Sequence, residues 1–552
     1  VGSAALLLAT WTLAMIVLAL FVALHLDGSS ANLPALLPGG RLTYPSGYAN
    51  ANAAQWLMAF WPALFLARSE QLHWALRGVF GGGAVVLADL ALLSQSRGSV
   101  YSSAAMLIIV FALIGGRLRT FAVLVPVAAG IALSAPSLLR VGNHLSAGAA
   151  MRSNLHSGLQ VMLGVGLAVG LVIALAAAVQ SERQFSQAAL MRTRRILGLA
   201  AVAALLAAVV GGLVVAGNPI TRVEHAWSTF KGGYGADSQT GSRLVSGLGS
   251  NRYDFYRVAL DEFVAHPLVG IGADNFSQQY LRHRRSDETP RYPHSIELRT
   301  LSQSGLLGTL LALVGLGAAL MAGARSLRSS DQLMHTVAAG ALAGFAYWFV
   351  HGSVDWFWEF AGLGAPAFAL LGIACGLSSP PSSGWSFSRS FALSRSLILA
   401  TLSLICMVSA ISLAAPWFSQ LQIQQAAHVW VTQPQRAYAL LGGAAHLDPL
   451  SEEPYLIAGS IAARLDDLPL ADHEFSLALG RAPENVYATL ERGAIASTLH
   501  QRAQALVLLR RAAALDPHDP LTQTALRLAR HGQLVSVEEL NRLILLSASQ
   551  LA

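Results

Sequence analysis

Residues 251–308 read NRYDFYRVALDEFVAHPLVGIGADNFSQQYLRHRRSDETPRYPHSIELRTLSQSGLLG. They lie in the only long polar interruption of a hydrophobic chain, and they hold its densest cluster of Arg, His, Asp and Glu before the C-terminal tail. We therefore interpret most of the remaining chain as a scaffold that presents this segment at one face of a membrane.

The composition is typical of a membrane protein. Of the 552 residues, 54% are hydrophobic and 12% are charged, and the mean hydropathy is +0.52. The net charge of +7 does not indicate nucleic-acid binding, because most arginines fall in short loops between apolar runs, where they orient a protein in the bilayer. Both cysteines, Cys375 and Cys406, lie in apolar runs, which excludes a disulfide framework and a cysteine-based metal site as organising features.

Eleven apolar runs are long enough, or nearly so, to cross a membrane, which takes about 17–25 residues. The first run has no basic stretch or cleavage site before or after it, so we expect a retained helix. The predicted fold is all-α: a polytopic membrane helix bundle of about 11 or more transmembrane helices over residues 1–416. The runs are 4–26, 51–67, 75–93, 102–116, 120–139, 158–180, 196–216, 304–324, 335–352, 358–377 and 395–416.

The arginines predict the orientation of these helices. With a cytoplasmic N-terminus, the inner loops carry twelve arginines and the short outer loops carry four, as the positive-inside rule requires. The large loop 217–303 and the tail after residue 416 are then extracytoplasmic, because seven and eleven crossings both end outside. The inner set is Arg68, Arg77, Arg117, Arg119, Arg183, Arg192, Arg194, Arg195, Arg325, Arg328, Arg389 and Arg395, and the outer set is Arg41, Arg97, Arg140 and Arg152.

The tail, residues 417–552, has a soluble composition and an internal repeat of 34 residues. The spacing A-x3-[LF]-x2-A-x4-P resembles tetratricopeptide repeats, which form an α-solenoid of helix pairs. This resemblance implies a binding module for a protein partner, with no chemistry of its own. The recurring residues are Ala437, Leu441, Ala444 and Pro449, then Ala471, Phe475, Ala478 and Pro483, then Ala505, Leu509, Ala512 and Pro517.

Three arginines are candidates for binding an anionic donor. Arg97, in LLSQSRGSVY, could hold the pyrophosphate of a lipid carrier, because a guanidinium matches phosphate oxygens. The alternative is an interfacial arginine that reaches lipid headgroups. Arg252 and Arg257 flank an aromatic pair on a predicted amphipathic helix and could form a basic face. The alternative for Arg257 is an ion pair within its own helix, with Asp254, Asp261 or Glu262.

His294 is the candidate base. It precedes a predicted membrane helix, and its ordinary pKa of about 6.5 suits proton removal from a hydroxyl at neutral pH. Glu297, three residues on, is close enough on a helix to orient the ring. The alternative is a partly exposed loop histidine. The sequence has no HExxH or CxxC spacing and no G-x-x-x-x-G-K-[ST] run, so we expect no metal and no cofactor.

The same segment resembles the O-antigen ligase and polymerase superfamily of bacterial membrane glycosyltransferases. The family's usual Asn and Glu are replaced here by Ser295 and Gln303. The matching features are Arg252-x3-Tyr256, HPLVGIGADNF at 266–276, His294-Ser295, QSGLLG at 303–308, GYANANA at 47–53, SRG at 96–98, and HGSVDWFWE at 351–359, which is similar to a His-x3-Asp-Trp step in members with tetratricopeptide tails.

The resemblance implies transfer of a glycan from a polyprenyl-pyrophosphate-linked donor to a hydroxyl of a lipid, glycan or protein acceptor. The reaction would take place without a metal at the outer face of the bacterial inner membrane. His294 would be the catalytic base, and Arg252, Arg97 and Arg257 would bind the donor pyrophosphate. Two alternatives stay open: a transporter or flippase of lipid-linked or anionic solutes, and a membrane scaffold that acts through its repeats. The supporting residues would be Glu297, Asn52, Asp274 and Asn275.

Overall fold

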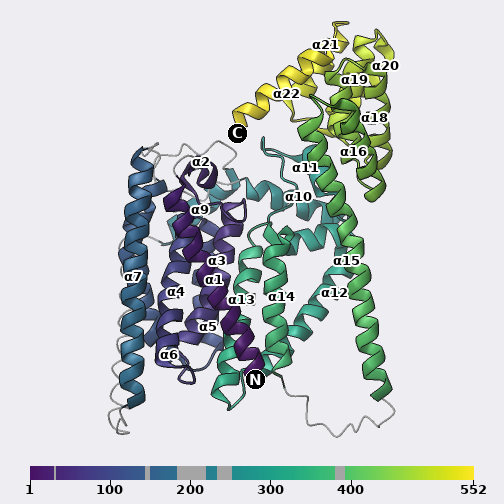
Figure 1. Cartoon of the computed structure of the whole chain (residues 1–552). Helices are drawn as coiled ribbons and strands as arrows, with labels where there is room; N and C mark the ends of the chain where they lie inside the picture. The colour runs from purple at the N-terminus through teal and green to yellow at the C-terminus, as the bar shows by residue number, and fades with distance from the viewer. Residues whose placement is uncertain (30–32, 143–148, 183–218, 233–250, 379–391, 552) are drawn as a thin grey trace. The chain divides into compact units, whose positions relative to one another are not determined.

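The computed structural model describes residues 1–29, 33–142, 149–182, 219–232, 251–378 and 392–551 (Figure 1). All regular secondary structure within these ranges is helical, which confirms the predicted all-α class. The chain forms two compact units. The first consists of Val1–Phe276 and Pro290–Pro380, and the second of Ser277–Thr289 and Pro381–Ala552.

The first unit carries the apolar helices. Its elements are α1 (Gly2–Gly28), α2 (Leu33–Leu36), η1 (Pro38–Gly40), α3 (Ala49–Ala67), α4 (Trp74–Leu93), α5 (Arg97–Leu113), α6 (Arg117–Leu139), η2 (Arg140–Gly142), α7 (Ala149–Glu182), α9 (Pro219–Gly232), α10 (Arg252–Ala265), α12 (Ile296–Ser326), α13 (Gln332–Gly352), η3 (Phe357–Glu359) and α14 (Ala361–Gly376).

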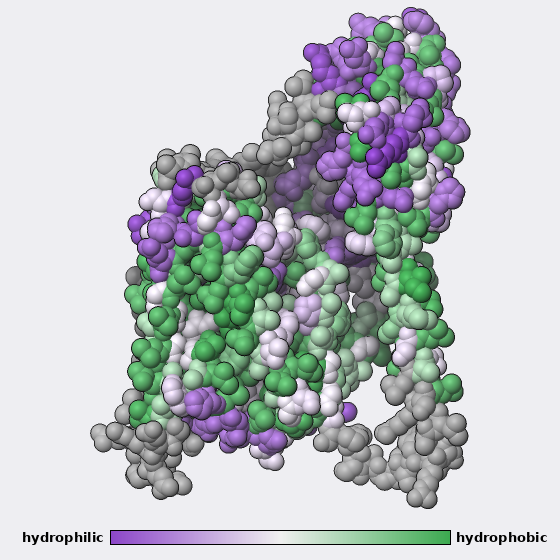
Figure 2. All heavy atoms as spheres, viewed as in Figure 1, coloured by the Kyte–Doolittle hydropathy of each residue, from purple (hydrophilic) through white to green (hydrophobic). Residues whose placement is uncertain are grey.

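Seven helices of the described residues are long and apolar enough to cross a membrane, so this is a multi-pass membrane protein. Figure 2 shows hydrophobic side chains over the middle of the first unit's helices and hydrophilic ones near their ends. The predicted number of eleven is not confirmed, and the predicted run 196–216 lies outside the described residues. The seven spans are Gly2–Gly28, Trp74–Leu93, Arg117–Gly142, Ala150–Gln180, Ile296–Ser326, Gln332–Gly352 and Ala400–Val429.

Helices α3, α4 and α13 form the interior of the first unit, and α4 also packs closely against α7. Glycines make the α4–α7 approach close. A side-chain carbon placed on Gly78 would lie 2.6 Å from the carbonyl oxygen of Gly170, and one on Gly82 would lie 2.5 Å from that of Gly166. Small residues four apart on both helices are the usual means by which membrane helices bring their backbones together.

The second unit contains α11 (Phe276–His283), which starts at the last residue of the first unit, α15 (Ala392–Val429), α16 (Pro434–Leu447), α17 (Glu453–Arg464), α18 (Leu468–Arg481), α19 (Val486–Thr498), α20 (Arg502–Leu515), α21 (Pro520–Arg530) and α22 (Val537–Leu551). The apolar run predicted over 395–416 belongs to α15, which continues to Val429 without a break at the proposed domain boundary after residue 416. That boundary stays a prediction.

The columns of the 34-residue repeat are buried. Ala471, Phe475 and Ala478 of α18 are fully buried, and the residues one period away in α16 and α20 are 0–3% exposed. Contacts recur with the same period, because Gly459 of α17 lies against Phe475 and Gly493 of α19 lies against Leu509. The helix pairs α17–α18 and α19–α20 therefore repeat one packing arrangement. Their identity as tetratricopeptide repeats remains a prediction.

Candidate functional site

A buried carboxylate, Asp355, lies at the centre of the candidate site, in the turn after α13. Its side chain is 0% exposed, and it accepts hydrogen bonds from Arg252 Nη2 at 2.8 Å, from Asn50 Nδ2 at 2.6 Å and from the Tyr48 hydroxyl at 3.0 Å. The backbone N–H of Trp356 donates a fourth, at 2.8 Å. Burial raises the pKa of Asp355, but the Arg252 guanidinium, the nearby rings of His294 and His351, and the Trp356 N–H together hold the pKa below its ordinary value. This carboxylate is therefore ionised, and its two oxygens accept four hydrogen bonds.

One face of α10 explains the Arg-x3-aromatic pattern. Arg252 and Tyr256 are four residues apart and thus neighbours on the helix surface. Arg252 reaches Asp355, while the Tyr256 hydroxyl donates to the carbonyl oxygen of His294 at 3.3 Å. Between them, the buried ring of Phe255 lies 5.2 Å from the His294 ring. A single helical turn thus fixes both the arginine and the histidine.

His294 has an unusual backbone and an unusual environment. Its φ is +56°, a left-handed conformation that costs a residue with a side chain about 1–2 kcal/mol. Its Nδ1 is buried and has no hydrogen-bond partner among the described residues. Burial lowers the pKa of His294 to about 4, and Asp355 and Arg252 act on it in opposite directions. The imidazole is therefore neutral at physiological pH.

The motifs HPLVGIGADNF (266–276) and QSGLLG (303–308) hold a kink in α12, the helix that follows His294. At Gly305 the helix breaks, with φ +61° and ψ −163°, and the turn 267–272 packs into the break. The turn replaces the missing helical hydrogen bonds: Ile271 and Gly272 donate to Ser302 and Gln303, and Leu306 and Leu307 donate to Pro267 and Leu268, at 2.8–3.1 Å. Any side chain at Gly305 would clash with the Leu268 backbone. These backbone hydrogen bonds between the turn 267–272 and residues 302–307, called the clasp below, join the end of α10 to α12.

Glu297 does not orient His294, contrary to the expectation from sequence. Its carboxylate instead accepts hydrogen bonds from Ser353 Oγ at 2.6 Å and from Ser295 Oγ at 2.9 Å, and none from His294 within the described residues. Glu297 thus ties the start of α12 to the turn that carries Asp355. Ser295 also caps α12 through the backbone N–H of Leu298. The position where the family has Asn is therefore a helix cap here.

The start of α5 brings Arg97 to the same end of the bundle. Arg97 is the first residue of α5 and is half-buried. A side-chain carbon on the next residue, Gly98, would lie 2.8 Å from Nε2 of His351, four residues before Asp355. The backbone of Arg97 therefore lies near the turn that holds Asp355.

Three further residues that the sequence predicted for the site bind groups outside the Asp355 network: Arg257, Asp274 and Asn275. Arg257 donates to Asp254 at 2.7 Å and to Asp261 at 3.2 Å, so it makes the ion pairs within its own helix that the alternative interpretation expects. Asp274 accepts from Arg299 at 3.2 Å. Asn275 donates to the Ile271 carbonyl at 2.7 Å and so stabilises the turn between α10 and α11.

The sequence motif N-x-N contains two asparagines with different roles. Asn52, the residue chosen from the sequence, donates to the Leu42 carbonyl at 3.3 Å and to Ser94 Oγ at 3.0 Å, away from Asp355. Asn50 is the one that binds Asp355. Sequence reasoning thus missed Asn50, Tyr48 and Asp355 as site residues. All three lie in the sequence motifs GYANANA (47–53) and HGSVDWFWE (351–359), which were the available signals.

The arrangement combines a half-buried cation with a neutral imidazole. Arg252 makes one hydrogen bond, to Asp355, within the described residues, so most of its N–H groups can bind an anion. Asp355 holds the guanidinium, and Asn50 and Tyr48 hold Asp355 in turn. The aromatic rings of Phe255 and Trp356, 5.2 and 6.4 Å from that of His294, make an apolar wall beside the histidine. Such a site could bind a phosphate-bearing substrate and accept a proton next to it.

A comparison with protein families points to the family that the sequence motifs resemble. The model of the family described as O-antigen ligase matches residues 145–313, a range that includes Arg252 and His294 but ends before Asp355. No curated protein matches the chain. The family match supports the O-antigen ligase superfamily and, in general terms, a membrane glycosyltransferase of the ligase or polymerase type.

Proposed function

We propose that this protein transfers a glycan from a polyprenyl-pyrophosphate donor to an acceptor hydroxyl, at the outer face of the bacterial inner membrane. The observation that carries the proposal is the Arg252–Asp355 pair next to the neutral His294. The outward orientation rests on the arginine distribution in the loops.

Arg252 would bind the pyrophosphate of the donor, with Arg97 as a second cation. A guanidinium held by a buried carboxylate keeps its direction, so less conformational freedom is lost when the donor binds. As the bond to the sugar breaks, negative charge builds up on the pyrophosphate. A fixed guanidinium stabilises that charge more than it stabilises the bound donor, and this difference lowers the barrier.

His294 would act on the acceptor. The acceptor hydroxyl gives its proton to Nε2 of His294, since Nδ1 is buried, and its oxygen attacks the anomeric carbon of the donor sugar. The bond from that carbon to the pyrophosphate oxygen breaks, and polyprenyl pyrophosphate leaves with the electron pair. The product is the glycosylated acceptor. The repeat helices of the second unit would bind the acceptor or a partner protein.

The test is a transfer assay with the purified full-length chain in liposomes. The donor is a polyprenyl-pyrophosphate-linked glycan, and released polyprenyl pyrophosphate is measured. His294→Ala should lower the rate by about a hundredfold or more, the usual effect of losing a general base. His266→Ala, which removes an exposed histidine of the same segment, is the control and should keep its activity. Full activity of a correctly folded His294→Ala protein would overturn the assignment.

A further inference from the structure

A polar cavity lies at the other end of the helices that build the Asp355 site. That site lies at the starts of α3 and α5 and at the end of α13, whereas the cavity lies at the ends of α3 and α5 and at the start of α13. Its volume is about 240 Å³, smaller than a typical drug-sized pocket of about 300–1,000 Å³. It therefore suits a small polar group, and the proposed transfer reaction does not use it.

Arg68 is the central residue of the cavity. It is 6% exposed, and within the described residues no carboxylate pairs with it. Its Nη1 donates to the Gly115 carbonyl at 3.1 Å and to the Thr120 hydroxyl, while its other N–H groups make no hydrogen bond in this part of the chain. Burial, with Arg119 nearby, lowers the pKa of Arg68 to about 10, so it stays charged at neutral pH. A buried charge without a counter-ion is costly and favours an anionic ligand.

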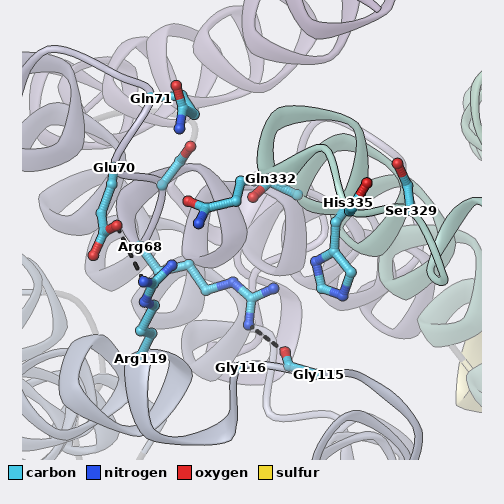
Figure 3. A pocket seen from close by; sticks show the side chains of 12 residues that line it. Arg68, Glu70, Gln71, Gly115, Gly116, Arg119, Ser329, Gln332 and His335 are labelled. Carbon is cyan, nitrogen blue, oxygen red and sulfur yellow. Dashed lines mark hydrogen bonds and ion pairs between the residues drawn. The ribbon is translucent and has the colours of Figure 1, made fainter.

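Other polar groups surround this guanidinium. In Figure 3, Arg68 lies between the Arg119–Glu70 ion pair, at 3.1 Å, and the ring of His335. Glu70 also accepts from Gln180 at 2.9 Å, so its charge is shared with partners other than Arg68. The hydroxyl of Ser69 is buried in the cavity wall and has no partner among the described residues. Among the described residues, the cavity is thus lined by a cation that no carboxylate pairs with and by a serine whose buried hydroxyl has no partner.

We propose that this cavity binds a phosphate group, carried either by the headgroup of an anionic phospholipid or by a small soluble phosphate. Arg68 supplies the charge, and Ser69 and Gln332 supply further hydrogen bonds. Phosphate oxygens match both the planar guanidinium and neutral donors of this kind. The loop arginines at this end of the bundle favour anionic lipids nearby.

The experiment measures binding of two probes to the purified full-length chain in detergent: dihexanoyl phosphatidylglycerol and inorganic phosphate. Arg68→Gln removes the charge. Because it also removes the hydrogen bonds to Gly115 and Thr120, Gln332→Glu provides a second test, which adds a negative charge in the first turn of α13, where an acid stabilises the helix. Arg325→Gln is the matched control, since Arg325 is an exposed arginine outside the cavity.

Wild type should bind at least one probe, and both cavity variants should weaken its binding about tenfold: Arg68→Gln because it removes a charged hydrogen bond, and Gln332→Glu because its carboxylate repels the phosphate. Arg325→Gln should bind like wild type. Binding of phosphatidylglycerol alone identifies a lipid headgroup, and comparable binding of inorganic phosphate identifies a soluble phosphate. The proposal is wrong if wild type binds neither probe, if both cavity variants bind like wild type, or if the control weakens binding equally.

Discussion

Asp355 is the residue on which the candidate site depends most. It holds Arg252, Asn50 and Tyr48 together, and it is fully buried. Asp355→Asn would leave Arg252 half-buried without a counter-charge, so we expect it to lower the free energy of unfolding by about 3 kcal/mol. Equilibrium unfolding in mixed micelles measures this. Asp261→Asn, at a carboxylate that is 63% exposed, should cost less than about 1 kcal/mol, and equal effects of the two changes would contradict the network.

The low pKa of His294 has a measurable consequence. Below pH 6.5 the unfolded chain protonates this histidine, but the folded chain does so only near pH 4. The folded protein therefore loses stability as the pH falls from about 6.5 to 4. Carbethoxylation, which needs the neutral ring, should continue at pH 5 when it is followed by peptide mass spectrometry. Arg252→Gln should raise the pKa of His294 and Asp355→Asn should lower it; opposite shifts would contradict the geometry.

At the scale of the element, the clasp between the turn 267–272 and α12 depends on Gly305. Its backbone conformation is one that only glycine adopts readily, and the Leu268 backbone fills the space where a side chain would lie. Gly305→Ala should cost about 1–3 kcal/mol, seen as a lower melting temperature. Gly315→Ala in the same helix is the control, because Gly315 has helical backbone and open space around it. It should be neutral or slightly stabilising.

A second element-scale prediction concerns the segment 277–289, which leaves the first unit between Phe276 and Pro290 and packs with the repeats. Arg284 pairs with Asp516 at 2.8 Å, and both side chains are 6% exposed. Removing one partner with Arg284→Ala or Asp516→Ala should cost about 3 kcal/mol, and the double variant should cost much less than the sum. Arg282→Ala, which breaks a half-exposed pair, should cost less than about 1 kcal/mol. Additive effects in the double variant would contradict a buried pair.

For the whole molecule, the sequence predicts the class of fold well. The all-α membrane bundle follows from apolar runs, because a helix is the simplest structure that satisfies its own backbone in lipid. The period of 34 residues marked positions that are buried, such as Phe475. Helix ends were less predictable: α15 passes residue 416, since the chain from Trp417 to Val429 contains neither Gly nor a further Pro.

The site could be predicted only in part. Arg252 and His294 lie 42 positions apart in one polar segment, so a local pattern was enough to single them out. Asn50 and Asp355 are 305 positions apart, and neither position shows by itself that the other is its partner. The choice between Asn50 and Asn52 depends on which face of the first turn of α3 meets the turn after α13, and that is decided by tertiary packing. Glu297 was misjudged for the same reason, because its partner Ser353 lies 56 positions away.

In the proposed mechanism, Arg252 binds the donor and His294 activates the acceptor. The most direct test measures donor binding and single-turnover transfer on the same preparations of Arg252→Gln and His294→Ala. We predict that His294→Ala binds the lipid-linked donor like wild type and transfers it at least a hundredfold more slowly, while Arg252→Gln loses at least tenfold in donor affinity. Unchanged transfer by His294→Ala, or unchanged donor affinity of Arg252→Gln, would contradict these two roles.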